Sequence, residues 1–225
     1  HFSVSTLSLF MAVDMDLRAA GMDSGNVWFS RTTDVDASYA YAERATLTGR
    51  EEIPGIFCNA TTLKDPTMRS DGLHTVEAMA ISSVDPFARW KDMAPGTRGD
   101  DYRQLKLDLT ERILDAVECF VPGLRERTVF RALGTPLTNV RFLNATRGGI
   151  YGTEKTLGNL GPFGFDVATH VPGLFQCGAS TLAPGINGVT HSGLNAAAAA
   201  LGCDADELLT ATGQELRIHP AEPSA

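Results

Sequence analysis

Several features that define common protein classes are missing from this sequence of 225 residues. It has no run of about 18 apolar residues, the length that a membrane-spanning helix needs. It also has no basic amphipathic helix of the kind that binds anionic membrane surfaces. Lysine and arginine number 19 against 27 acidic residues, for a net charge of −8. Because nucleic-acid binding needs clustered cations, this balance argues against a nucleic-acid partner.

Cysteine is also scarce. Cys58, Cys119, Cys177 and Cys203 are scattered and form no CxxC pair, which argues against a metal site and a disulfide framework. Free thiols are typical of a reducing compartment, so a cytoplasmic protein is expected. Cys177 lies in a short apolar run and is expected to be a small buried residue.

What is present is an ordinary globular composition, with 43% hydrophobic and 20% charged residues, enough to bury a full core. Apolar runs and alternating patterns predict strands at residues 3–14, 26–30, 56–60, 74–82 and 124–133. Few crossover helices separate these strands. We therefore expect a mixed or antiparallel sheet within an α/β (α+β) fold.

Helices are predicted between and after the strands. A capping aspartate starts a short helix at residues 34–44, and a clear amphipathic helix of about twenty residues begins at Asp101 and ends before Pro122. Residues 83–100 are expected to form a long loop. Thr135 and Pro136 predict the start of another short helix. A last helix is expected at 204–213, followed by a disordered tail at 214–225.

The most informative stretch runs from Thr169 to Cys203. Residues 174–177 predict a buried strand, a glycine-rich loop follows, and an alanine-rich helix begins at about Gly188. The start of such a helix presents free N–H groups and a positive dipole end, which suit a phosphate or the electron-rich edge of a flavin ring. A tight strand-to-helix turn before a packing helix explains the same residues, and the pattern alone leaves both interpretations open.

Two motifs carry a family resemblance. PGLFQCGASTLAPGINGVTHSGLNAA, within residues 172–197, resembles the closing FAD-binding segment of the phytoene desaturase and carotenoid isomerase-like flavoproteins, a branch of the amine-oxidase-type group. LGTPLT at 133–138, RFL at 141–143 and GGIYG at 148–152 are similar to the block that precedes that segment. One departure is Ala179, where many relatives carry an acidic residue.

The resemblance implies FAD as the cofactor and assigns residues to it. Those at the helix start would face the flavin ring: Asn187, Gly188, Val189 and Thr190. Those before it would face the ribityl and phosphate groups: Gly178, Ala179 and Ser180. His191 is either a packed histidine or a polar contact to the ring or substrate. No catalytic residue is assigned, since no Ser-His-Asp order, H-E-x-x-H motif or paired carboxylates occur. A redox enzyme whose cofactor carries the chemistry fits that absence.

The loop between the two motifs holds Tyr151, Phe163 and Phe165 among glycines. Long loops in compact domains are usually functional, so these rings are candidates to line a substrate cavity. Ordinary packing is the alternative.

The resemblance also predicts the organisation of the chain. Residues 1–133 would form part of a substrate-binding domain, and 134–213 would complete an FAD-binding domain of the Rossmann type. That family carries a glycine-rich GxGxxG fingerprint near the start of a longer chain, and no such fingerprint occurs here. We therefore expect a heteromer, in which this C-terminal half joins a partner chain that carries the fingerprint.

The function implied is an FAD-dependent oxidoreductase that desaturates, saturates or isomerises a lipophilic, polyene-like substrate. Two alternatives stay open from the sequence. One is a flavin oxidase acting on an amine or an aromatic metabolite, and the other is a non-catalytic subunit that caps a flavin-binding partner.

Overall fold

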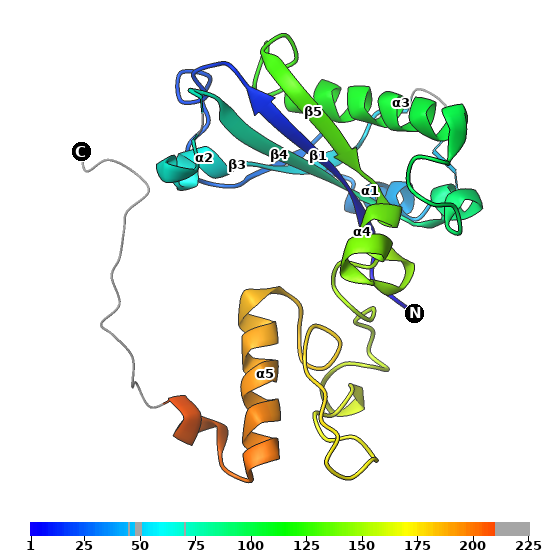
Figure 1. The fold of residues 1–225 in the computed structure, drawn as a ribbon, viewed down its shortest axis with the longest axis vertical. Coiled ribbons are helices and arrows are strands. Elements are labelled where there is room, and N and C mark those ends of the chain that lie inside the picture. The colour runs from blue at the N-terminus through cyan, green and yellow to red at the C-terminus, as the bar shows by residue number, and fades with distance from the viewer. Residues whose placement is uncertain (45, 48–50, 70, 210–225) are drawn as a thin grey trace. The chain divides into compact units, whose positions relative to one another are not determined.

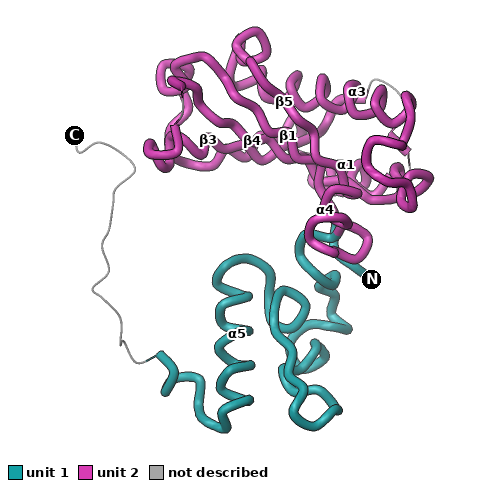
Figure 2. The backbone as a smooth tube through the Cα atoms, viewed as in Figure 1, with its two compact units in different colours: residues 1–4, 149–218 teal, residues 5–148, 219–225 magenta. Residues whose placement is uncertain are grey.

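The computed structural model describes residues 1–44, 46–47, 51–69 and 71–209. These fall into two compact units (Figure 2). The sheet unit comprises residues 5–148, and the loop unit comprises residues 1–4 with 149–209. The predicted α+β class is confirmed, because one sheet and several helices make up the structure. The predicted domain division at residue 133 stays a prediction.

The sheet unit is built on five antiparallel strands in the order β2-β3-β4-β1-β5. Their bounds are β1 Ser5–Val13, β2 Val27–Ser30, β3 Gly55–Ala60, β4 His74–Ser82 and β5 Thr128–Gly134. All five lie where the hydrophobic patterns predict strands. β1 occupies an inner position between β4 and β5, and its register with β5 shifts between Ala12 and Val13.

Helices and short 3-10 turns connect the strands (Figure 1). The α-helices are α1 Val35–Ala42, α2 Thr61–Lys64, α3 Gly99–Val117, α4 Pro136–Leu143 and α5 Gly185–Leu201. The 3-10 turns are Pro66–Met68, Asp85–Trp90, Thr146–Gly148, Gly161–Phe163 and Ala205–Leu209. The loop expected at 83–100 therefore contains a 3-10 turn, whose Phe87 and Trp90 are buried. None of the described helices is both long and apolar enough to cross a membrane.

One hydrophobic core lies between the sheet and α3 in the sheet unit. The apolar stripe of α3, including Leu109, Ile113 and Val117, is fully buried. It belongs to the same cluster as Leu7 and Leu9 of β1. The predicted amphipathic helix is thus confirmed, and its stripe shows which face of the sheet it covers.

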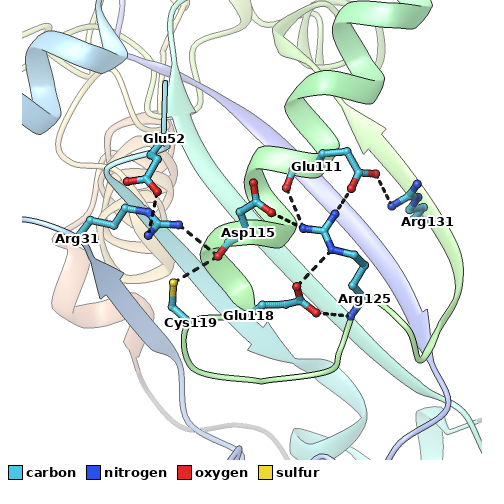
Figure 3. A network of polar contacts seen from close by, with 8 residues as sticks. All are labelled: Arg31, Glu52, Glu111, Asp115, Glu118, Cys119, Arg125 and Arg131. Atoms are coloured by element: carbon cyan, nitrogen blue, oxygen red, sulfur yellow. Dashed lines mark hydrogen bonds and ion pairs between the residues drawn. The ribbon is translucent and has the colours of Figure 1, made fainter. Parts of the chain in front are cut away.

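A polar network fastens the C-terminal half of α3 to the segment leading into β5 (Figure 3). The guanidinium of Arg125 binds the carboxylates of Glu111, Asp115 and Glu118, the last at 3.2 Å. Arg131 of β5 binds Glu111 at 2.8 Å. Arg31, just after β2, donates to the Asp115 carbonyl at 3.2 Å. The network holds α3 against both the β5 and the β2 sides of the unit.

The loop unit contains α5 and two 3-10 turns but no strand within its described residues. The buried strand predicted at 174–177 is wrong: the segment forms one isolated bridge, between Ala168 and Phe175. No described neighbour offers it a full ladder of hydrogen bonds, so it stays a turn. Cys177 is exposed, contrary to the buried position expected. The helix predicted at 204–213 corresponds to a 3-10 turn at 205–209, and its remainder and the tail lie outside the described residues.

Candidate functional site

The glycine loop and α5 are locked together by Ser192, which is completely buried. Its hydroxyl accepts the N–H of Gly178 at 2.7 Å and hydrogen-bonds the hydroxyl of Thr181. The Thr181 hydroxyl also donates to the Gly178 carbonyl at 2.8 Å. The loop therefore has a fixed conformation ahead of the helix. This role of Ser192 was not predicted from the sequence, where its only signal is a hydroxyl on an otherwise small and apolar helix.

The three glycines of this segment serve different purposes. Gly178 and Gly185 have φ angles of +115° and +83°, a region that side chains disfavour, and a Cβ on either would meet open space. At Gly188, a Cβ would lie 2.3 Å from the Ala183 carbonyl oxygen. The missing side chain at Gly188 is thus explained by the chain's own backbone. Gly178 and Gly185 instead leave space beside the loop.

The start of α5 is exposed and uncapped. The helix follows Pro184, and no side chain among the described residues caps it. The first N–H groups of a helix have no partner within the helix, so here they face outward with the positive end of the dipole. Asn187 and Thr190 are exposed at this end, and Val189 is 38% exposed. This end of the loop unit can donate hydrogen bonds to an electron-rich group.

The loop that precedes the segment packs directly on it. The Thr153 N–H donates to the Ser180 hydroxyl at 3.2 Å, and the Lys155 ammonium donates to the Ser180 carbonyl at 2.9 Å. Gly152 and Gly164 both pass close to this stretch: a Cβ on Gly152 would lie 2.5 Å from the Ser180 hydroxyl, and one on Gly164 would lie 3.6 Å from the Thr181 carbonyl oxygen. The structure therefore brings the two sequence motifs together at residues 179–181.

The aromatic residues proposed for a substrate cavity all belong to the loop unit and are exposed. Phe163 is 71% exposed, and Tyr151 and Phe165 are about half exposed. No ring contact joins these three residues in the described part of the chain. His191 is exposed on α5. The predicted flavin-contacting and substrate-lining residues remain predictions.

A separate polar pocket of about 330 Å³ lies at one end of the sheet. His74 is its buried member: its Nδ1 is 2.8 Å from the Thr62 hydroxyl, which also accepts the Thr75 N–H. Burial lowers the pKa of His74, and the positive charge of Arg69 adds to that shift. The other residues that line the pocket are Asp14, Met15, Asp16, Arg18, Leu63, Arg69 and Gly72. No cluster able to hold a metal ion occurs among residues 1–209 where they are described.

No family model matches the chain. Individual proteins do. The chain is 27% identical to the all-trans-retinol 13,14-reductase of Rattus norvegicus over 95% of its own length and 36% of the reductase. It is 30% identical to the Danio rerio enzyme of the same name over 67% of this chain and 25% of the enzyme. With the chloroplastic prolycopene isomerase of Arabidopsis thaliana, the identity is 29% over 72% of this chain and 26% of the isomerase.

These matches confirm the resemblance to the phytoene desaturase and carotenoid isomerase-like group. They extend beyond the two motifs, since the match to the rat reductase covers nearly the whole chain. The chain spans only about a quarter to a third of the length of the curated relatives that it matches.

Proposed function

We propose that the chain forms part of an FAD-dependent oxidoreductase that desaturates, saturates or isomerises a lipophilic polyene. The observation that carries this proposal is the kind of relatives found: reductases named for retinol and isomerases named for prolycopene, both conjugated hydrocarbon chains. The shared feature of these substrates is a long, apolar polyene. Neither an amine oxidase nor a non-catalytic subunit is favoured by these relatives.

The geometry of the loop unit fits a flavin nucleotide. The uncapped start of α5 offers N–H donors, Gly178 and Gly185 leave room beside the loop, and Ser192 keeps both in place. We assign the exposed residues of this start, Asn187, Val189 and Thr190, to the flavin ring side. Gly178, Ala179 and Ser180 are assigned to the ribityl and phosphate side. Gly188 contributes by letting the Ala183 carbonyl approach. The flavin, when bound, would supply the hydride chemistry, and the protein would orient it.

A complete flavin site needs more chain than these 225 residues provide. No GxGxxG fingerprint is present to hold the pyrophosphate. We propose that a polypeptide segment outside this sequence carries it and completes the site. The chain alone should then be free of flavin and poorly soluble, whereas the chain produced with such a segment should purify yellow. A stable monomer of the chain alone that binds FAD tightly would contradict this part of the proposal.

The flavin assignment is tested by Asn187→Asp. An aspartate in the first turn favours the helix, so folding should survive, but its charge opposes an electron-rich group at that end. We expect FAD affinity of the completed protein to fall by roughly tenfold or more. The matched control is Asn195→Asp, an exposed position further along the same helix, which should leave affinity unchanged. The measurement is flavin absorbance after dialysis. Full occupancy in Asn187→Asp would remove the start of α5 from the site.

A further inference from the structure

The register of the five strands sorts their side chains onto two faces of the sheet. One face carries the core against α3, with Leu7, Leu9 and Ala78 buried. On the other face, Phe10 is opposite Glu77 of β4 and Ala132 of β5, and Trp28 is opposite Phe57. We call this second surface the open face. Its large apolar members are Phe10, Trp28, Phe57, Met79, Ile81 and Phe130.

The open face is apolar and accessible. Trp28 is 74% exposed, Phe130 58% and Phe10 47%, and the rings of Trp28 and Phe57 meet edge to face at 5.0 Å. α4 meets this face at Thr6, whose hydroxyl accepts from the Asn139 amide. A contiguous group of aromatic side chains on one sheet face is unusual on a protein surface and marks a binding surface.

The charge pattern of the open face limits what can bind there. Within the five described strands, Glu77 is the only ionisable side chain that the register places on it. Glu77 pairs across the ladder with Asn59, whose side chain is buried, and with Phe10. A carboxylate without a neighbouring cation repels fatty acids, phosphates and other anions. It accepts a hydrogen bond from a neutral hydroxyl.

The size of the face suits a long molecule. A row of paired residues crosses all five strands through Trp28, Phe57, Met79, Ser8 and Gly134. Four inter-strand steps correspond to about 19 Å. The row is aromatic at the β2 end and small at the β5 end, so a slender chain can lie flat across it.

We infer that the open face holds the hydrocarbon chain of a neutral polyene alcohol, with Glu77 and Asn59 meeting its hydroxyl end. The inference rests on the proposed function and adds to it a second substrate surface, outside the loop unit. Glu77 is here a positioning residue that selects an uncharged polar end. A covering polypeptide segment is the rival occupant, and it predicts no binding of a free polyene alcohol.

The probe is all-trans-retinol, titrated into the full 225-residue chain. Trp28 is one of two tryptophans, and the other, Trp90, is buried. Bound retinol should quench tryptophan emission by energy transfer, and Trp28→Phe should remove most of that quenching. Since Trp28 is exposed, this variant should fold like the parent.

Two charged variants locate the binding surface. Phe10→Asp and Phe130→Asp should each weaken retinol binding roughly tenfold or more, because each removes an aromatic contact and buries a charge. The control Leu107→Asp changes an exposed apolar residue of α3, so retinol binding should stay within about twofold of the parent. Equal weakening in all three variants, or no binding to the parent chain, would overturn the inference.

Glu77→Gln tests the selection of the polar end. The parent should prefer retinol over its methyl ether, which cannot donate a hydrogen bond. The variant should lose that preference by about threefold or more, because a neutral amide accepts more weakly than a carboxylate. An unchanged preference would contradict the assigned role of Glu77.

The flavin-loaded protein separates the two proposals. If it converts a polyene and Phe10→Asp leaves KM unchanged, the open face is not the substrate surface and the proposed function still holds. If the flavin-loaded parent converts no polyene at all, the proposed function is wrong. Retinol binding to the open face would then be a property of the sheet alone.

Discussion

The two units bury their side chains to very different degrees. The sheet unit has a continuous core in which many large residues, such as Leu9, Phe87 and Ile113, are fully buried. In the described part of the loop unit, only Ser192 and Ala198 are buried. Leu157 and Ile186 are 90% and 86% exposed there. A segment that buries so little apolar area cannot offset its conformational entropy alone. The sheet unit is therefore self-sufficient, whereas the loop unit needs a cofactor or further polypeptide to complete it.

The largest effect is expected in the core of the sheet unit. Leu9→Ala should lower the free energy of unfolding by about 2–5 kcal/mol, because the site is closely packed on all sides. Leu157→Ala in the loop unit should change it by about 0.5 kcal/mol or less. Urea unfolding of the chain measures both. Comparable losses would mean that the loop unit has a core of its own.

The Arg125 network should come next in size. Arg125→Met leaves Asp115 and Glu118 without this guanidinium, and Glu111 with Arg131. We expect a loss of about 1–3 kcal/mol in the free energy of unfolding, since the partly buried carboxylates lose their counter-charge.

The control for Arg125 is Arg103→Met, which removes an exposed pair with Asp100 at the start of α3. Its effect should stay within about 0.5 kcal/mol. If both variants lose the same amount, the network contributes no more than an ordinary surface ion pair.

A pair of glycines on α5 tests how the loop unit is built. Gly193→Ala meets nothing within 4 Å and should stabilise the helix by about 0.5–1 kcal/mol. Gly188→Ala would press its Cβ against the Ala183 carbonyl, so it should loosen the loop before α5 despite the better helix former. Far-UV circular dichroism with temperature compares the two. A stabilising Gly188→Ala would show that the Ala183 carbonyl is free to move.

The smallest effect expected is a pH dependence that belongs to the sheet unit. His74 has a pKa below its ordinary value of 6.5 in the folded protein. The unfolded chain therefore binds more protons, and stability should be full above about pH 6.5 and fall as the pH drops towards the lowered pKa. His74→Asn keeps a polar atom near Thr62 and should flatten this slope. Thermal unfolding at about pH 7.5 and about pH 5.5 measures it. An equal slope in the variant would assign the effect to other groups.

The sheet unit could be predicted well from the sequence because its strands and α3 bury regular apolar patterns. The alternating residues of β1 and the stripe of α3 specify which faces meet. The prediction failed at residues 174–177, where an apolar run indicates a strand but no described neighbour supplies a ladder. Ser192 and the role of Gly188 were also missed, since both depend on contacts with a loop that periodicity does not describe.

Hydrogen exchange of the backbone amides tests the difference between the units most directly. In the chain alone, amides of β1 and β4 should exchange slowly, and those of α5 should exchange close to the rate of an unprotected helix. When the chain is produced with a segment that carries the nucleotide fingerprint and is loaded with FAD, exchange in α5 should slow by roughly tenfold or more, with β1 unchanged. If α5 is already as protected as β1 in the chain alone, the loop unit is complete by itself, and it needs neither the flavin nor a further segment.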